Sequence, residues 1–192
     1  METKYFDHAA TTGTKEEVLK EMLPYFSLNY GNASSMYKVG RVSKKAIDTA
    51  REQVACAIGA DRKEIYFTGC GSESNNLALK GVLYAENQKN HIITTNIEHP
   101  SILDTCKTLE KQGFFVTYLN VDQTGLISLE ELENSITPKT ALISIMFANN
   151  EIGTIQPIEQ IGIIAKKHHI LFHTDSVQAC RKYKNRCKRH EY

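Results

Sequence analysis

The chain has 192 residues, 41% hydrophobic and 23% charged, which is typical of a globular protein with an ordinary apolar core. No apolar run reaches the ~18 residues that a membrane span requires, and the polar, acidic start Met1–Asp7 differs from a secretory signal peptide. We therefore expect no membrane association and a cytoplasmic location, which the odd number of cysteines, 5, also favours.

The formal net charge is +1, but the cations are concentrated at the end of the chain. The last segment contains Arg181, Lys182, Lys184, Arg186, Lys188 and Arg189 against the single anion Glu191. The rest of the chain is mildly acidic. Such a tail can bind nucleic acid weakly through phosphate charge, and we predict no specific nucleic-acid partner.

Segments with helical periodicity alternate with short β-branched or aromatic runs. Helices are predicted at 14–28, 38–58, 73–86, 100–111, 128–135 and 157–168, and strands at 65–68, 91–95, 114–119, 141–147 and 170–173. Several of these strands lack polar alternation, as strands buried on both faces do. The pattern predicts an α/β fold: three α/β/α layers around a mostly parallel sheet.

Polar segments follow four of the predicted strands, at 69–76, 96–100, 148–153 and 174–178. In an open parallel sheet, ligands bind beyond the carboxyl ends of the strands, where loops lead into helices. We therefore expect these four segments to converge on one edge of the sheet.

The first segment, Gly69–Ser72, has small residues that let backbone N–H groups approach an anion at a helix N-terminus. A tight turn with Ser72 as an ordinary N-cap is the alternative. In the last segment, Asp175 follows an apolar strand and needs a cationic or donor partner, since unpaired burial of a carboxylate is costly. A protonated ring nitrogen would satisfy it, as would a helix cap or a salt bridge, and Gln178 could face the same ligand.

The two middle segments contribute His99 and the pair Asn149 and Asn150. A histidine there can stack on a ring and move protons near neutral pH, although a lone histidine is more often structural. The amides suit a substrate carboxylate or a plain turn. No metal site is predicted, because His168 and His169 point to different faces and no Cys or carboxylate has suitable ligand spacing around them.

Together these segments resemble the motifs of cysteine desulfurases, in the class V aminotransferase family of enzymes that use pyridoxal 5′-phosphate (PLP). Six matching stretches run in the family's order from residue 5 to about 179: 7–12, 31–35, 67–76, 98–101, 149–153 and 173–178. The resemblance implies the large domain of a fold type I PLP enzyme, here incomplete. Cys70 stands where the family commonly has Gly, and Tyr37 where a His is common.

The resemblance also implies a role for each candidate residue. Gly71 and Ser72 would hold the cofactor phosphate, Asp175 would pair with the ring nitrogen, and Gln178 would bind the phenolic oxygen. His99 would stack on the ring and assist proton transfer as the catalytic residue, and Asn150 would lie beside the substrate or ring. The family reaction removes sulfur from L-cysteine, gives L-alanine and an enzyme persulfide, and supplies iron–sulfur cluster assembly or tRNA thiolation. Family partners are a second copy, in a homodimer, and sulfur-acceptor or scaffold proteins.

In the family, the chain continues after the segment that matches 175–178 to a Ser-x-His-Lys motif, whose lysine binds PLP covalently. Here it continues instead as the basic segment 180–192, which has no apolar periodicity. With A/T-rich codons, a one-nucleotide shift turns this segment into a sequence similar to the family's continuation. We therefore expect a frameshift after Ala179, with residues 1–14 as an N-terminal segment, 15–179 as a partial large domain and 180–192 as an aberrant tail. Cys180 and Cys187 receive no metal-binding or sulfur-carrying role.

These features predict a truncated cysteine desulfurase that binds PLP non-covalently at best and is nearly inactive by itself. Two alternatives stay open. One is another class V enzyme, such as a selenocysteine lyase or an aminotransferase-like protein. The other is a non-catalytic fragment that binds a full-length desulfurase.

Overall fold

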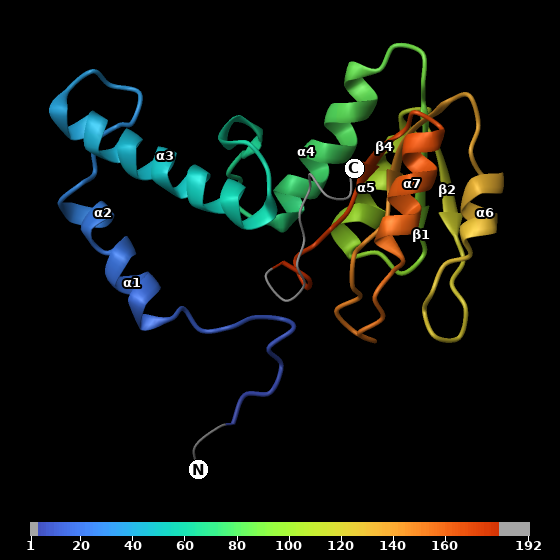
Figure 1. The fold of residues 1–192 in the computed structure, drawn as a ribbon, viewed down its shortest axis with the longest axis horizontal. Helices are drawn as coiled ribbons and strands as arrows, with labels where there is room; N and C mark the ends of the chain where they lie inside the picture. Colours follow the sequence, from blue (N-terminus) through green and yellow to red (C-terminus); the bar gives the residue numbers. More distant parts are fainter. Residues whose placement is uncertain (1–3, 181–192) are drawn as a thin grey trace. The chain divides into compact units, whose positions relative to one another are not determined.

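The computed structural model describes residues 4–180, which form two compact units, one ending at Tyr66 and the other beginning at Phe67 (Figure 1). Within this part of the chain, every helix is too short or too polar to cross a membrane. The expected division at residues 14 and 179 stays a prediction, and residues 181–192 of the expected tail lie outside the described part.

The first unit is helical. It contains α1 (Glu16–Met22), α2 (Pro24–Ser27), α3 (Lys38–Ile58) and a short 3-10 helix (Arg62–Glu64). The single helix expected at 14–28 is divided because Pro24 has no backbone N–H and is accommodated at the first position of a new helix. Helix α3 has the expected bounds and ends where Gly59 adopts a left-handed φ of 73°.

The turn at 31–35, one of the six matching stretches, packs against the start of α3 through two glycines. A Cβ on Gly31 would lie 2.5 Å from the carbonyl carbon of Val39. A Cβ on Gly40 would collide with the Ser35 hydroxyl and the Asn32 carbonyl oxygen. The backbones therefore approach to a distance that only glycine permits.

Substitution Gly40→Ala is expected to loosen this turn, because the new methyl group forces the backbones apart at a cost of about 1–3 kcal/mol. Gly81→Ala is the matched control: Gly81 is also inside a helix, but among the described residues no atom beyond its chain neighbours and its own helix backbone lies within 4 Å of the added Cβ. Amide hydrogen exchange in residues 31–43 should become faster in G40A. In G81A, exchange in α4 should be unchanged or slower, because alanine has a higher helix propensity than glycine. Equal exchange in G40A and wild type would contradict the close-packing interpretation.

The second unit contains the sheet. Its elements are α4 (Gly71–Ala85), β1 (His91–Thr95), α5 (Pro100–Lys111), β2 (Phe115–Leu119), α6 (Leu129–Asn134), β3 (Thr140–Ser144), α7 (Ile158–Lys167) and β4 (Leu171–His173). The strand order is β2-β1-β3-β4 and every pairing is parallel. The predicted parallel sheet with crossover helices is confirmed.

Alternate residues of the central strands face two separate cores, so the sheet lies between two helical layers. Ile92 and Leu142 belong to one core with Leu79 and Leu83 of α4 and with Ile102 and Leu109 of α5. Ile93 and Ile143 belong to the other, with Leu132 of α6 and with Ile161 and Ala165 of α7. All of these side chains are buried, which explains why the strands read as continuous apolar runs.

The strand predicted at 65–68 is wrong. Ile65 has extended dihedrals, φ −94° and ψ 122°, but its N–H donates to Arg62 O, and within the described residues this segment pairs with no strand. Its β-branched and aromatic residues favour an extended backbone, yet a strand also needs a neighbour to complete its hydrogen-bond ladder. The segment therefore leads directly into α4, which begins two residues earlier than predicted.

Candidate cofactor site

Three of the four polar segments leave the same edge of the sheet. Residues 96–99 follow β1, residues 145–150 follow β3, and residues 174–178 follow β4, and all three strands point the same way. The N-terminus of α4 supplies the fourth segment. The convergence expected from the sequence is confirmed for the described chain.

The start of α4 lies against the segment after β4. A Cβ on Gly71 would be 3.6 Å from Cγ2 of Val177, so this loop and the segment carrying Asp175 and Gln178 are neighbours. The loop is closed by the Glu73 carboxylate, which accepts a 2.6 Å hydrogen bond from the Gly69 N–H. Cys70 is the N-cap and Ser72 is the second helical residue, so the alternative of Ser72 as the N-cap is wrong.

Ser72 and His99 line one open cavity of about 400 Å³ between the starts of α4 and α5. Both side chains are exposed, and Lys80 adds a cation to the wall. The remaining lining residues are Asn76, Pro100, Ser101, Asp104, Thr105 and Thr108. A hydroxyl, a helix N-terminus and a cation beside one cavity are the groups that an anionic phosphate needs.

Asp175 and His99 are joined by two residues that the sequence analysis assigned no role. Nδ2 of Asn75 lies 2.9 Å from Oδ2 of Asp175 and 2.9 Å from Oγ of Ser101. The Ser101 hydroxyl lies 2.8 Å from Nδ1 of His99, and the Ser101 backbone N–H donates to the same nitrogen at 3.1 Å. A continuous hydrogen-bonded chain thus connects the half-buried carboxylate to the exposed imidazole.

The partners of the Asp175 carboxylate are neutral donors. Oδ1 accepts from the Val177 N–H at 3.0 Å and Oδ2 accepts from Asn75, and in residues 4–180 it forms no salt bridge. The salt-bridge alternative is therefore absent from the described chain. A half-buried carboxylate with only neutral donors still has capacity for a cationic one, such as a protonated ring nitrogen.

Glu98, next to His99, is a second carboxyl at this edge and is almost completely buried, with 4% of its surface exposed. Its Oε1 accepts from the Thr95 hydroxyl at 2.8 Å and the Met146 N–H at 2.9 Å, while Oε2 is buried and has no hydrogen-bond partner among residues 4–180. Burial raises the pKa of Glu98 to about 7 against the lowering effect of these two donors, and the charge of Asp175 raises it further. Glu98 therefore ties β1 to β3 as a largely neutral acid near pH 6.

The histidine of β4 is held neutral at the same edge. Burial lowers the pKa of His173, with the Asp175 charge acting in the opposite direction, and its Nδ1 lies 2.9 Å from the Ser144 hydroxyl. Burial thus opposes the charged form of two groups at this edge, the His173 imidazolium and the Glu98 carboxylate.

The two asparagines after β3, Asn149 and Asn150, differ in burial and in hydrogen bonding. Asn149 is buried: its Oδ1 accepts from the N–H groups of Glu151 and Ile152, and its Nδ2 donates to the Ile97 carbonyl at 3.0 Å. It therefore shapes the turn and ties it to the segment that carries His99. Asn150 is exposed in that turn, outside the hydrogen-bonded chain from Asp175 to His99, and Gln178 is half-buried three residues after Asp175.

The sequence offers one signal for Asn75. It lies four and eight residues before Leu79 and Leu83, the buried positions of α4, so it occupies the core-facing stripe of the helix. A polar residue in that stripe requires a partner. No comparable pattern points to Glu98 or Ser101. They flank His99 and Pro100 in a segment that local sequence patterns assign to a loop.

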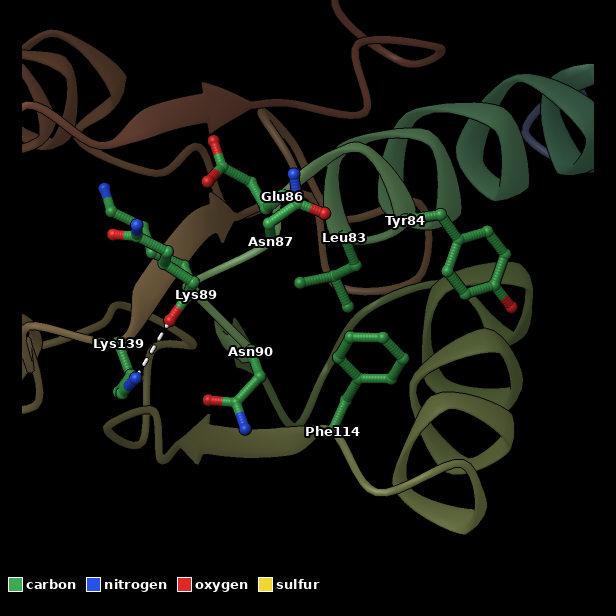
Figure 2. Close-up of a pocket in the computed structure, with 9 residues that line it drawn as sticks. Leu83, Tyr84, Glu86, Asn87, Lys89, Asn90, Phe114 and Lys139 are labelled. Carbon is green, nitrogen blue, oxygen red and sulfur yellow. Dashed lines mark hydrogen bonds between the residues drawn. The ribbon is translucent and has the colours of Figure 1, made fainter.

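A different cavity, of about 640 Å³, lies at the opposite edge of the sheet (Figure 2). Its wall includes Asn90, Phe114 and Lys139, each directly before a strand, and the Lys139 ammonium donates to the Gln88 carbonyl at 3.0 Å. None of the candidate site residues lines it. The two cavities are therefore separate. Of the predicted site residues, Ser72 and His99 line the cavity at the carboxyl edge, whereas Gly71, Asn150, Asp175 and Gln178 lie outside its lining.

Comparison with known proteins gives one consistent result. The chain matches the family described as Aminotransferase class-V from residue 4 to residue 191. It is 57% identical over 176 residues to the cysteine desulfurase IscS of Clostridium botulinum strain Kyoto, and also 57% identical to that of Methanosarcina thermophila. Each alignment covers 91% of this chain and 44% of the relative, so the chain spans less than half the length of these relatives.

Solved structures agree. A structure described as SspA in complex with cysteine superimposes with a TM-score of 0.96 at 45% identity, covering 98% of this chain and 55% of that one. A NifS-like protein gives 0.94 at 43% identity, covering 97% and 52%. With a family match over nearly its whole length and relatives that are cysteine desulfurases, the chain belongs to the class V aminotransferase family.

Proposed function

We propose that the carboxyl edge of the second unit is the PLP site of a cysteine desulfurase, and that this chain is the N-terminal part of such an enzyme. The main support is the arrangement of three residues. The Asp175 carboxylate has neutral hydrogen-bond partners and is linked by hydrogen bonds to His99, and His99 lines the same cavity as Ser72. The desulfurase names of the relatives support the choice within the family, and no feature of the described chain favours a selenocysteine lyase.

The residues present fit this cofactor. Ser72 and backbone N–H groups at the start of α4 would bind its phosphate, with Lys80 on the wall of the same cavity. Asp175 would accept a hydrogen bond from the protonated ring nitrogen and Gln178 would donate to the ring oxygen. His99 would stack on the ring, and Asn150 would lie beside the substrate carboxylate or the ring. PLP itself supplies an electron sink that makes bonds beside the substrate amine cleavable.

The enzyme's wider chemistry is part of the proposal. The substrate would be L-cysteine, the products L-alanine and a protein-bound persulfide, and the recipients sulfur-acceptor or scaffold proteins. A homodimer and a cytoplasmic location are proposed with it. The similarity to SspA in complex with cysteine supports the choice of substrate most directly.

The lysine that binds PLP covalently in the family would come from the Ser-x-His-Lys motif. Sequencing the coding DNA beyond the codon for Ala179 tests the expected frameshift. We expect the motif in another frame of that DNA. Codons for 180–192 that do not read as the family's continuation after a one-nucleotide shift would refute it.

The phosphate role of Ser72 is tested by comparing ligands with and without a phosphate. Pyridoxamine 5′-phosphate is the suitable probe, because it lacks the aldehyde that reacts with surface lysines. Ser72→Ala is expected to weaken its binding about 5- to 20-fold, since one hydrogen bond to a charged group is lost. Binding of unphosphorylated pyridoxamine should be unchanged. An equal loss for both ligands, measured by calorimetry, would remove Ser72 from the phosphate site.

A further inference from the structure

We propose that Asn75 is a positioning residue that acts through the Ser101 hydroxyl to hold His99 in one neutral tautomer, with its proton on Nε2. The role in catalysis rests on the proposed PLP function, whereas the tautomer follows from the hydrogen bonds of the chain itself. The observation is the unbroken chain of contacts of 2.8–2.9 Å from Asp175 through Asn75 and Ser101 to His99.

The directions of these hydrogen bonds follow from Asp175. An ionised carboxylate can only accept, so Asn75 must present its NH₂ group to it, which fixes the amide orientation. The same Nδ2 lies 2.9 Å from the Ser101 hydroxyl and has a second hydrogen to donate there. The Ser101 oxygen is thereby an acceptor, and its own hydrogen remains for Nδ1 of His99 at 2.8 Å.

The backbone fixes the last link independently. The Ser101 N–H, 3.1 Å from Nδ1 of His99, can only donate, because a peptide nitrogen has no acceptor role. Nδ1 of His99 thus faces two donors and is the unprotonated nitrogen of the neutral ring. The ring proton is on Nε2, and His99 lines the cavity beside Ser72 as a hydrogen-bond donor.

The residues of this relay are well fixed. Asn75 is 5% exposed and lies in the same buried stripe of α4 as Leu79 and Leu83. His99 is the N-cap of α5, Pro100 is its first residue, and the Thr105 hydroxyl donates to the Ser101 carbonyl at 2.8 Å. Because each donor is held by a helix, the tautomer of His99 is set before any ligand binds.

The test measures the chemical shifts of the two ring nitrogens of His99 by long-range proton–nitrogen NMR on the chain without cofactor. The signals that disappear in His99→Gln assign them to His99. Wild type is expected to show one neutral tautomer, with Nδ1 unprotonated. In Asn75→Asp two carboxyls about 2.9 Å apart share one proton, which lies between them, so the new side chain has no hydrogen to donate to Ser101. The Ser101 hydroxyl then turns toward it and leaves its oxygen free to accept from Nδ1. The ratio of the tautomers should then shift about tenfold toward Nδ1–H, the effect of one hydrogen bond.

Ser101→Ala makes the test specific. Without the hydroxyl, the backbone N–H still favours the Nε2–H tautomer, but N75D should no longer change it, so the two substitutions are expected to be strongly non-additive. Asn134→Ala, an exposed asparagine at the end of α6, is the control and should leave His99 unchanged.

Two results would overturn the proposal: an Nδ1–H tautomer or a mixture in wild type, or an equal effect of N75D with and without Ser101. If N75D does not fold, the wild-type spectrum still decides the tautomer. A shift of the Nδ1 signal in S101A, expected on loss of the hydroxyl donor, then decides whether the Ser101 hydroxyl donates to Nδ1, and an unshifted signal would overturn the link. Since no cofactor is present, failure of pyridoxamine 5′-phosphate to bind would refute the proposed function while leaving this measurement valid.

Discussion

Glu98→Gln is expected to raise the stability of the chain relative to wild type by roughly 2–3 kcal/mol more at pH 8 than at pH 5. Glutamine keeps the oxygen that accepts from Thr95 and Met146 and cannot ionise. It therefore removes the free-energy cost of a buried carboxylate while preserving the link between β1 and β3.

The pH range of this effect follows from the pKa of Glu98, which burial raises from 4.5 to about 7 in the folded chain. Below pH ~4.5 the carboxyl is protonated in both the folded and the unfolded chain, and it has no effect on their difference. As pH rises toward 7, only the unfolded chain releases the proton, so stability falls. Above pH 7 the full cost is present.

Urea denaturation of the wild type and E98Q at several pH values measures this difference. Glu86→Gln, which changes an exposed carboxyl at the end of α4, is the control and should show no such trend. A stability difference between E98Q and wild type that is the same at pH 5 and pH 8 would show that Glu98 is ionised in the folded chain throughout this range.

Asp175→Asn is expected to weaken binding of pyridoxamine 5′-phosphate about 10- to 100-fold. The substitution keeps the size of the side chain and an oxygen that can accept from the Val177 N–H. It removes the negative charge, and a hydrogen bond between charged groups contributes about 1.5–3 kcal/mol. Asp48→Asn, which removes the same charge from the ion pair with Arg51 in the first unit, should leave binding unchanged.

The two variants also separate the charge of Asp175 from the overall charge of the chain. If D175N binds the probe as tightly as wild type, the ring nitrogen has another partner and the assignment of Asp175 is wrong. If D48N weakens binding equally, the effect is one of overall charge rather than of the site.

The sequence predicted the architecture well because periodicity carries it. The runs at 91–95 and 114–119 and the helices at 38–58 and 100–111 lie within a residue of their observed bounds, since burial on two faces or one face leaves a clear pattern. The run at 65–68 shows the limit of this reasoning. Its composition favours an extended backbone, but pairing depends on residues that are remote in sequence.

The site was predicted as a set of separate residues, and the connections between them were not. That Asp175 and His99 lie at one edge follows from parallel strands and the loops after them, whereas Ser72 reaches this edge through the packing of α4. The link through Asn75 and Ser101 requires α4 and α5 to lie side by side, which local patterns do not specify. The raised pKa of Glu98 was also not predictable from local patterns. It results from burial between β1 and β3, which depends on packing rather than on the neighbouring sequence.

The most direct test of the PLP site is a crystal structure of this chain with pyridoxamine 5′-phosphate bound. We expect the phosphate beside Ser72 and the first turn of α4, and the ring nitrogen within hydrogen-bonding distance of the Asp175 carboxylate. A probe bound instead in the cavity lined by Asn90, Phe114 and Lys139, with Ser72 and Asp175 making no contact to it, would contradict the account (Figure 2).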